Sequence, residues 1–412
     1  MATTAFCTWI VIHPRIHKLR KHRFPHKLAL WLKTIIAPEF IAVEAAQEWT
    51  QAQKIIKQSS KFTNGELHLV QAFYIGMFGL QYRTSRGTRI LWPNQFIWLL
   101  ERGLLNWNHH EEWGLSRESI EDKGNSDAAA KLLALAQVAW FVAQSIMRAI
   151  HNLPLAPLES MTLSYIPLFG VAYFYWWKKP KDIETPSEIY LPSMSPEEEA
   201  TFLSLALHDR FDNEGTAAQE SLWGVWALTP RMFEKEAADR AFEDEQEKYM
   251  VREGRFRQHI KACSNTRCTD TRHLEPVIPT RRRETTLAHW DPELYHSSFL
   301  WPLCCLAGVS FPALHLISWH STFPTLVETW LWRASTVASM VSMLVFMQFE
   351  KLVIGLRDPF TIVKIFFPGL YIVTRIVLLV GAFAAFRAME PAVYDTYTAS
   401  SSSYWLDMMQ HS

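Results

Sequence analysis

The sequence predicts an all-α membrane protein, a bundle of about seven to eight transmembrane helices with a mainly helical cytoplasmic insert. Three observations lead to this fold class. Several segments of about 20 residues are almost free of charge, and this is the length a helix needs to cross a bilayer. The 41 basic and 41 acidic residues concentrate between these segments. The chain also contains 18 Trp, a residue type that collects at membrane–water boundaries.

Five segments in the later part of the chain have the length and apolarity of membrane helices, and two weaker candidates precede them. The weaker candidates are 28–46, which contains Lys33, Pro38 and Glu44, and 68–82. Residues 1–12 are apolar but too short to span a bilayer, so the first membrane helix is expected to be truncated. The five stronger segments are 130–150, 158–177, 297–319, 323–349 and 366–386.

The placement of positive charge supports this map, because loops rich in Lys and Arg stay on the cytoplasmic side. Basic residues cluster in 13–27 and directly after Tyr82, Trp177 and Phe349. If every weak candidate spans, these four clusters share one side and both termini lie opposite the cytoplasm. The map divides the chain into N-terminal membrane segments with loops (1–82), a cytoplasmic loop (83–129), a transmembrane hairpin (130–177), a cytoplasmic insert (178–295), C-terminal transmembrane helices (296–388) and a polar tail (389–412).

Short motifs follow one another along the chain in a specific order and spacing. The first are Cys7-Thr8-Trp9 with His13, and Ile36-Ala37-Pro38-Glu39-Phe40. Together with the later motifs they resemble a large fungal family of uncharacterised multi-pass membrane proteins. The resemblance implies membrane residence and a fungal source, and it supplies no activity, substrate or catalytic residue. The later motifs include Leu135, Gln137, Trp140-Phe141 and Gln144, then Trp176-Trp177-Lys178-Lys179-Pro180, Tyr371, Arg375 and Phe386-Arg387.

The chain departs from the pattern of this family in its last membrane helix and its tail. Gly381 stands where the last helix of the family usually carries a Glu. The usual ending with Trp and Pro-His is reduced to Tyr404-Trp405 in a Ser-rich tail. These departures leave the activity of this member open even where its class follows the family.

Polar side chains inside a membrane helix are costly, and each is therefore a functional hypothesis. In 130–150, Gln137, Trp140, Gln144 and Arg148 follow spacings of 3, 4 and 4 residues, which places them along one helical face. This face either lines a cavity or substrate path, or forms hydrogen bonds between helices that hold the bundle together. The second interpretation is favoured.

Arg148 and Glu159 are predicted to form an ion pair. Arg148 ends one helix and Glu159 begins the next, where the helix dipole favours a carboxylate. Only a short turn containing Pro154 and Pro157 separates the two helices, so both side chains reach the same membrane level. The pair is expected to fix the hairpin.

Arg375 lies near the middle of its helix, where an unpaired charge is expensive. It is therefore expected to face the interior of the bundle. Glu328, Gln137 and Gln144 are its expected partners, and structural pairing is favoured over binding of an anion or carboxylate. The candidate buried polar residues are Gln137, Gln144, Arg148, Glu159, Glu328 and Arg375.

No sequence motif identifies a catalytic residue, a cofactor or a metal. The chain has no Walker loop, no Gly-rich dinucleotide turn and no Gly-x-Ser-x-Gly elbow. His109-His110-Glu111-Glu112 lacks the i, i+4 spacing of a zinc helix, and Cys263 with Cys268 lacks a second ligand pair. The net charge of zero gives no evidence of a nucleic-acid partner. The expected partners are the lipid bilayer and an apolar small molecule.

Two functions follow from these observations. The leading hypothesis is a non-enzymatic membrane protein, acting as a scaffold, sensor or transport-related component. The alternative is a membrane-embedded enzyme of the cyclase or isomerase type acting on an apolar fungal secondary metabolite, because Trp and Tyr rings can stabilise cationic intermediates. A solid bundle with every buried polar group paired would favour the first, and an aromatic-lined cavity containing an acid would favour the second.

Overall fold

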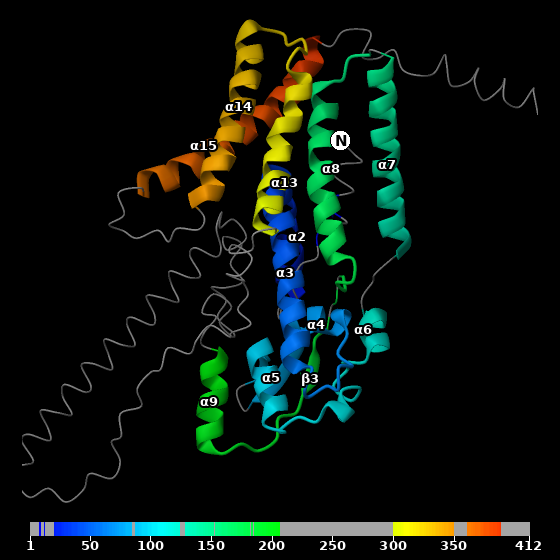
Figure 1. Cartoon of the computed structure of the whole chain (residues 1–412), viewed down its shortest axis with the longest axis vertical. Coiled ribbons are helices and arrows are strands. Elements are labelled where there is room, and N and C mark those ends of the chain that lie inside the picture. The colour runs from blue at the N-terminus through cyan, green and yellow to red at the C-terminus, as the bar shows by residue number, and fades with distance from the viewer. Residues whose placement is uncertain are drawn as a thin grey trace, which may run out of the picture.

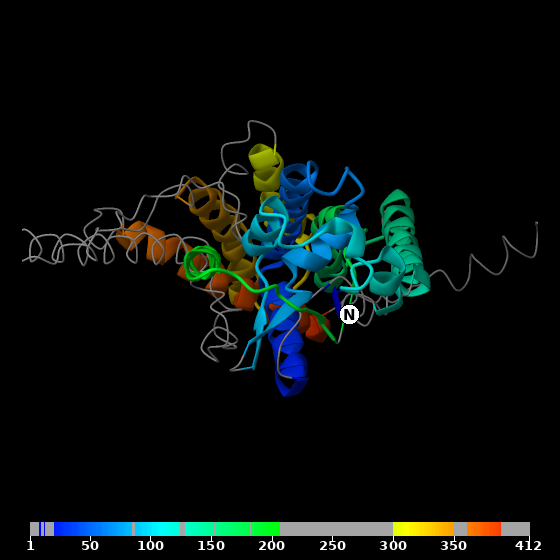
Figure 2. The same cartoon turned by 90° about the horizontal axis from the view of Figure 1, so that it is seen from below.

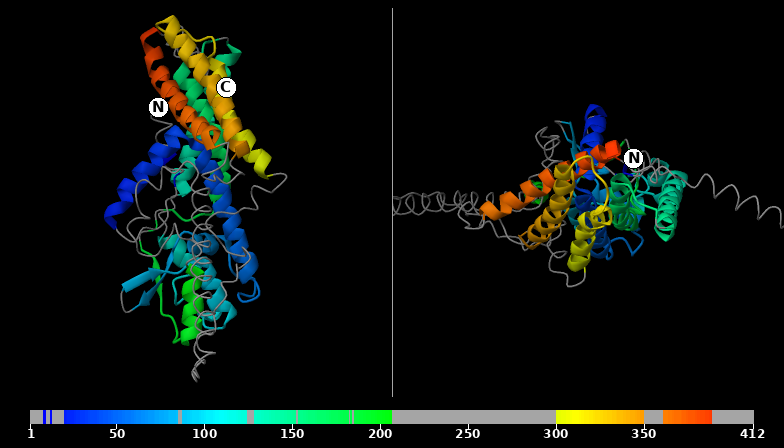
Figure 3. Two further views of the ribbon diagram at one scale, coloured as in Figure 1. Left: turned by 90° about the vertical axis from the view of Figure 1, so that its left-hand side faces the viewer. Right: turned by 90° about the horizontal axis from the view of Figure 1, so that it is seen from above.

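The structure is a computed structural model, and it describes residues 8–9, 12, 20–84, 87–123, 128–151, 153–181, 183, 185–206, 300–349 and 361–388. The described chain is helical apart from three short strands. The two ends of the described chain differ in the length and type of their secondary-structure elements (Figure 1). Long helices gather at one end, and short helices and the strands gather at the other, with α3 reaching from one to the other (Figures 1 and 3).

Helices α2 (Arg20–Ile36) and α3 (Pro38–Ser59) are separated by a single residue, Ala37. Ala37 is extended, with φ −142° and ψ 72°, and Pro38 occupies the first turn of α3. Proline disfavours helical geometry in the residue before it, and it is well suited to the first turn of a helix. The sequence Ala37-Pro38 therefore ends one helix and begins the next.

The short elements form a unit that we call the head, residues 60–123 and 185–206. Helix α4 (Leu69–Gly76) begins with a capping interaction, because Gln71 Oε1 accepts a hydrogen bond of 2.7 Å from the His68 backbone N–H. Strand β1 (Leu80–Thr84) pairs antiparallel with β2 (Gly87–Ile90) and parallel with β3 (Ser187–Ile189). The other helices of the head are α5 (Pro93–Glu101), η1 (Trp107–His109), α6 (Arg117–Lys123) and α9 (Pro196–Ala206).

The long helices form a unit that we call the apolar bundle. Seen from the head end, α7 lies on one side of α8 and α3, and α14 with α15 lies on the other (Figure 2). Leu168, Phe311 and Leu378 belong to the same buried core as the head residues Phe96 and Phe202. The bundle comprises α7 (Ala128–Ile150), α8 (Pro157–Trp176), α13 (Leu300–Leu314), η3 (His315–Ser318), α14 (Leu326–Phe349), α15 (Thr361–Ala384) and η4 (Ala385–Ala388).

The prediction of a bundle of seven to eight transmembrane helices is wrong. Among the described residues, two helices are long and apolar enough to cross a membrane, Leu132–Ile150 and Phe366–Ala388. Leu306–Ser318 is an apolar helix too short for the same test. The structure is thus mostly helical with a small three-stranded sheet, and two helices meet the length and composition of a span.

The other predicted spans fail for local reasons. The break at Ala37 divides 28–46, and in 68–82 the chain leaves α4 at Gly76, turns through Phe78 with φ 67° and enters β1. Helix α13 is short and continues into a 3₁₀ turn, while Ser, Thr and Pro lower the mean hydropathy of α8 and α14. The residues concerned are Ser160, Thr162, Ser164 and Pro167 in α8, and Ser335, Thr336, Ser339 and Ser342 in α14.

The structure describes the first part of the predicted cytoplasmic insert. Helix α9 begins where the acidic run Glu197-Glu198-Glu199 predicts a helix, and Ser195 caps it through a hydrogen bond of 3.3 Å from the Glu198 backbone N–H. Residues 207–299 and 389–412 lie outside the described residues, and with them Cys263, Cys268 and the Tyr404-Trp405 ending.

Candidate functional site

The break between α2 and α3 leaves backbone carbonyls without partners inside their helix, and side chains from two other helices bind them. The Tyr165 hydroxyl of α8 donates a hydrogen bond to the Ile35 carbonyl oxygen. Arg375 Nε of α15 donates to the Ile36 carbonyl oxygen at 2.9 Å. Side chains distant in sequence therefore bind the end of α2. We call this arrangement the helix-break site. It comprises Glu39, Tyr165, Tyr371 and Arg375 together with the rings of Phe311, His315 and Trp332.

Glu39 lies in the first turn of α3, directly after the break, and is 1 % exposed. A helix N-terminus favours a carboxylate through its partial positive charge. Glu39 Oε1 accepts a hydrogen bond from the hydroxyl of Tyr371, which lies one helical turn before Arg375 on α15. Glu39 and Arg375 attract each other electrostatically, so a buried carboxyl group and a buried guanidinium share this site.

Aromatic rings surround the charged groups. The Arg375 guanidinium carbon lies 3.6 Å from the centroid of the Phe311 ring, a cation–π contact. The rings of Phe311 and His315 are 5.1 Å apart, and those of His315 and Trp332 are 5.8 Å apart. Phe311, His315 and Trp332 are all buried, so the helix-break site combines a charged pair with an aromatic wall from α13, η3 and α14.

Four buried polar atoms of this site have no hydrogen-bond partner in the structure: Glu39 Oε2, Arg375 Nη1, His315 Nε2 and Trp332 Nε1. His315 Nδ1 lies 2.9 Å from the Phe311 carbonyl oxygen, which can only accept, so Nδ1 carries the hydrogen. In neutral His315 the Nε2 atom is then an acceptor. The site offers two donors and two acceptors that the described protein groups do not use.

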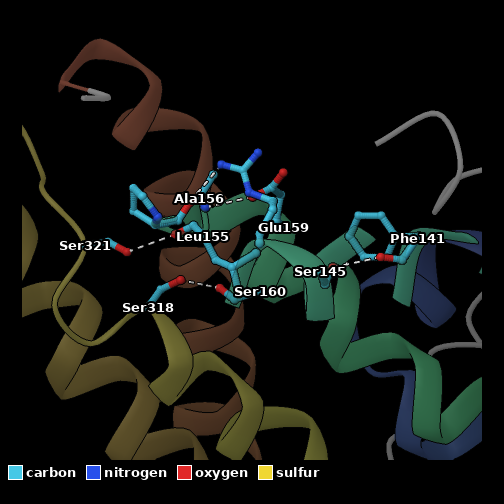
Figure 4. A network of polar contacts seen from close by, with 10 residues as sticks. Phe141, Ser145, Leu155, Ala156, Glu159, Ser160, Ser318 and Ser321 are labelled. Atoms are coloured by element: carbon cyan, nitrogen blue, oxygen red, sulfur yellow. Dashed lines mark hydrogen bonds and ion pairs between the residues drawn. The ribbon is translucent and has the colours of Figure 1, made fainter. Parts of the chain in front are cut away.

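The predicted ion pair between Arg148 and Glu159 is present, at 3.8 Å between Arg148 Nε and Glu159 Oε2. Figure 4 shows it within a polar network at the turn between α7 and α8. Arg148 Nη2 donates to the Pro154 carbonyl at 2.8 Å, and Glu159 Oε2 accepts from the Ala156 backbone N–H at 3.0 Å. These bonds tie both ends of the turn, so the network fixes the hairpin, as its position in sequence predicts.

The same network joins the hairpin to the next helices of the bundle. The Ser160 hydroxyl of α8 is hydrogen-bonded to the Ser318 hydroxyl of η3 (Figure 4). The Ser321 hydroxyl donates to the Leu155 carbonyl at 3.5 Å. The turn that links α13 to α14 is thereby held against the turn that links α7 to α8.

The structure does not bring the predicted partners to Arg375. Gln137 and Gln144 lie on α7, which is on the far side of α8 from α15 (Figure 2), and Gln144 is exposed rather than buried. Glu328 lies in the first turn of α14, where it pairs with Arg387 of η4, about three helical turns beyond Arg375. The expected partners of Arg375 are therefore wrong, and the α2–α3 break supplies the actual ones.

Of the side chains in this site the sequence predicts only Arg375, and it does not predict Glu39, Tyr165, Phe311, His315, Trp332 or Tyr371. A signal for Tyr371 is present, because it precedes Arg375 by four residues and so lies on the same helical face. Pro38 within an apolar run signals the break, and Glu39 beside it is a charge at a helix start. His315 carries no comparable local signal, because its role depends on the packing of α13 against α14 and α15.

A second polar network lies in the head and ties α4, α6 and β3 together. Lys123 Nζ donates to Ser187 Oγ at 2.8 Å, and Ser187 Oγ is hydrogen-bonded to the Tyr74 hydroxyl at 2.9 Å. Burial raises the pKa of Tyr74 above its usual 10.0 and lowers the pKa of Lys123 below its usual 10.5. Gly114, with φ +65°, passes so close that an added Cβ would lie 2.7 Å from Ser187 Oγ.

The described residues contain no group of three or more His, Cys, Asp or Glu side chains that could hold a metal ion. His109 Nδ1 and Glu112 Oε1 lie 3.0 Å apart, and both side chains are exposed.

Comparison with known protein families gives a match to the first half of the chain. Residues 3–207 match DUF8562, a family of unknown function. The DUF8562 match agrees with the expectation of an uncharacterised family. It includes Glu39, Tyr165 and the whole head, whereas Phe311, His315, Trp332 and α15 lie beyond it. Comparison with curated proteins and with solved structures gives no match.

The packing of Trp332 against Gly381 explains why a residue without a side chain stands at position 381. A Cβ added to Gly381 would lie 3.2 Å from a ring carbon of Trp332, which is tighter than an ordinary contact. Trp332 therefore packs in the space that a larger residue on α15 would need. A Glu at this position, as in the family that the sequence resembles, would have to displace the Trp332 ring.

Proposed function

We propose that this chain is a membrane-inserted protein that holds its apolar bundle in the bilayer and its head outside. In the membrane, the chain acts as a scaffold, sensor or transport-related component rather than as an enzyme. Helices α7 and α15 are the proposed spans.

The distribution of exposed apolar side chains carries this proposal. In the head, Tyr190 and Leu203 are the exposed large apolar side chains among the described ones, and the others are covered, which is the surface of a protein domain in water. The bundle exposes large apolar side chains along its length. Helix α7 is the extreme case, because only 17 % of the apolar stretch in Leu132–Ile150 is buried. The most exposed include Trp140, Phe174, Leu306, Leu326, Trp330, Val373, Val380 and Phe383.

The exposed apolar surface of the bundle has a free-energy cost in water, and contact with lipid removes this cost. Each exposed apolar side chain costs about 25 cal/mol per Å² in contact with water, and the bundle exposes more than twenty of them. Monomeric soluble proteins rarely show contiguous apolar surface of such extent. Trp140 and Trp330 at 68 % and 64 % exposure fit a position facing lipid.

The side of the membrane on which the head lies follows from its basic flank. Lys178 and Lys179 come directly after α8, and loops rich in Lys and Arg stay on the cytoplasmic side. We therefore propose a cytoplasmic head. A glycosylation acceptor introduced at residues 110–114 is expected to remain unmodified.

Extraction of cell membranes tests the insertion itself. The full chain is expected to remain in the membrane pellet after alkaline carbonate treatment and to require detergent for release. Release of the chain into the carbonate supernatant, or a monodisperse full chain in buffer without detergent, would contradict the proposal. A variant with Arg at Leu133 and Val380, on the exposed faces of α7 and α15, is expected to leave the pellet.

The helix-break site supports a second candidate, the membrane-embedded enzyme acting on an apolar metabolite. Its support is the combination of a buried carboxyl group, Glu39, a buried guanidinium, Arg375, and the rings of Tyr165, Phe311 and Trp332 around them. A strain with the gene deleted is expected to lose or accumulate an apolar metabolite, and a Glu39→Gln strain is expected to show the same change. An unchanged metabolite profile in both strains would count against this candidate and leave the first.

A further inference from the structure

We infer that the helix-break site binds a hydroxyl group that bridges Glu39 and Arg375, supplied either by water or by an alcohol. The inference goes beyond the proposed function. It does not depend on insertion into a membrane, because the groups concerned are buried among the helices of the chain itself.

The first step is the cost of the unpartnered atoms. Glu39 Oε2 and Arg375 Nη1 have no hydrogen-bond partner, and their side chains are 1 % and 3 % exposed. A buried polar atom without a partner costs about 1–3 kcal/mol, and a charged one costs more. Buried polar groups are almost always satisfied by protein or by a bound molecule. Two such atoms of opposite charge in one site point to a ligand between them.

The second step is the chemistry of that ligand. Arg375 Nη1 can only donate, and Glu39 Oε2 accepts when the group is a carboxylate. The ligand must therefore accept from one and donate to the other, and a hydroxyl group does both through a single oxygen. The charges of Glu39 and Arg375 cancel, so the site favours a neutral group over an ion. Inorganic anions and ammonium ions would each satisfy one residue and repel the other.

The third step is the shape of the surroundings. The other sides of both residues are already engaged, since Arg375 Nε donates to the Ile36 carbonyl and Glu39 Oε1 accepts from Tyr371. The Phe311 ring covers the guanidinium at 3.6 Å. The ring of His315 lies 5.1 Å from that of Phe311, and His315 Nε2 and Trp332 Nε1 offer one acceptor and one donor to a second hydroxyl. The walls are aromatic, so any larger part of the ligand is apolar.

Radiolytic labelling of the full chain in detergent tests for water. Hydroxyl radicals form from bound water in place, so Phe311 and Tyr371 are expected to be oxidised although both are buried. Phe96, which is 0 % exposed in the head, is the matched control and is expected to stay unmodified. The double variant Glu39→Leu, Arg375→Met is expected to lower labelling of Phe311 to the level of Phe96. Ser339→Ala, which removes an unpartnered buried hydroxyl elsewhere, is expected to leave it unchanged.

Mass spectrometry of the organic extract of the same purified protein tests for an alcohol. A hydroxyl-bearing apolar compound that co-purifies with the native chain and not with the double variant would identify the alcohol as the source. Labelling of Phe311 without such a compound would identify water. Phe311 labelled no more than Phe96, with no hydroxyl compound in the extract, would overturn the inference. If the double variant does not fold, Arg375→Lys and Glu39→Gln give the same comparison with smaller changes.

Discussion

The head and the apolar bundle solve the same problem, the burial of apolar side chains, in opposite ways. Among the described residues of the head, Tyr190 and Leu203 are exposed and the other large apolar side chains are covered. In the bundle many large apolar side chains face outward, and polar residues such as Ser335, Ser339 and Ser342 occupy the interior. The bundle therefore places polar side chains inside and many apolar side chains outside, whereas the head does the reverse. This is expected if the two units meet different solvents.

The largest expected effect comes from a matched pair of Phe→Ala substitutions, one in each unit. Phe96 is 0 % exposed in the head, and Phe383 is 50 % exposed on α15. Phe96→Ala removes a fully buried ring and is expected to cost about 3–5 kcal/mol of unfolding free energy. Phe383→Ala is expected to cost far less in detergent, because lipid or detergent replaces the lost contacts. Denaturation of the full chain in micelles, followed by Trp fluorescence, measures both, and equal losses would remove the contrast between the units.

A charge on the exposed face of α15 is the next largest effect. An Arg near the centre of a spanning helix costs about 2.5–3.5 kcal/mol of insertion free energy. Val380 is 60 % exposed, so Val380→Arg is expected to lower the membrane-inserted fraction. Glu112→Arg on the head surface is the control and is expected to change nothing. The two fractions are compared by carbonate extraction, and a Val380→Arg variant that inserts as well as the native chain would place this face away from lipid.

Removal of one partner from the hairpin ion pair has an intermediate effect. Arg148 is 7 % exposed and holds both Glu159 and the Pro154 carbonyl. Arg148→Ala is expected to cost about 1.5–3 kcal/mol, the range for hydrogen bonds to a charged group. The matched control is Arg117→Ala in the head, where the pair with Glu121 is exposed on both sides and contributes at most about 1 kcal/mol. Thermal unfolding of both variants decides whether the hairpin network is structural.

The smallest effect concerns the polar network of the head and the pH. Tyr74→Phe removes the hydrogen bonds of the Tyr74 hydroxyl with Ser187 Oγ and with the Ser187 backbone N–H, and is expected to cost about 1 kcal/mol or more at neutral pH. Burial raises the pKa of Tyr74 in the folded chain above 10.0, so above that pH the unfolded chain releases a proton that the folded chain retains. Stability of the native head therefore falls as the pH rises above 10, and Tyr74→Phe loses this dependence. A native and a variant chain with the same alkaline unfolding profile would exclude Tyr74 as a cause.

Local sequence predicts the parts of this molecule that depend on neighbouring residues. The ion pair of Arg148 and Glu159 follows from their places at the two ends of one short turn, and α9 follows from its acidic start. Helices α7 and α15 are mainly apolar over a length that can cross a bilayer, so their composition alone identifies them.

The remainder depends on contacts between distant residues. The three-stranded sheet includes β3, a strand of three residues that pairs with β1 from more than a hundred positions away, and no periodicity indicates so short an element. Apolar runs predicted spans where Pro38, Pro167 and the serines of α14 break or dilute the helix. Arg375 requires a buried partner in any packing, but the choice of the α2–α3 break over Glu328 is made by the arrangement of α15 against α2 and α8.

Labelling with a photoreactive apolar reagent that partitions into the bilayer tests the central claim most directly. The reagent is applied to membranes that contain the full chain, and the labelled peptides are identified by mass spectrometry. The account predicts label on the exposed faces of α7 and α15, at Trp140 and Phe383, and none in the head peptides that contain Trp98 and Trp107. Label spread evenly over head and bundle, or absent from α7 and α15, would contradict the division of this molecule into a unit in lipid and a unit in water.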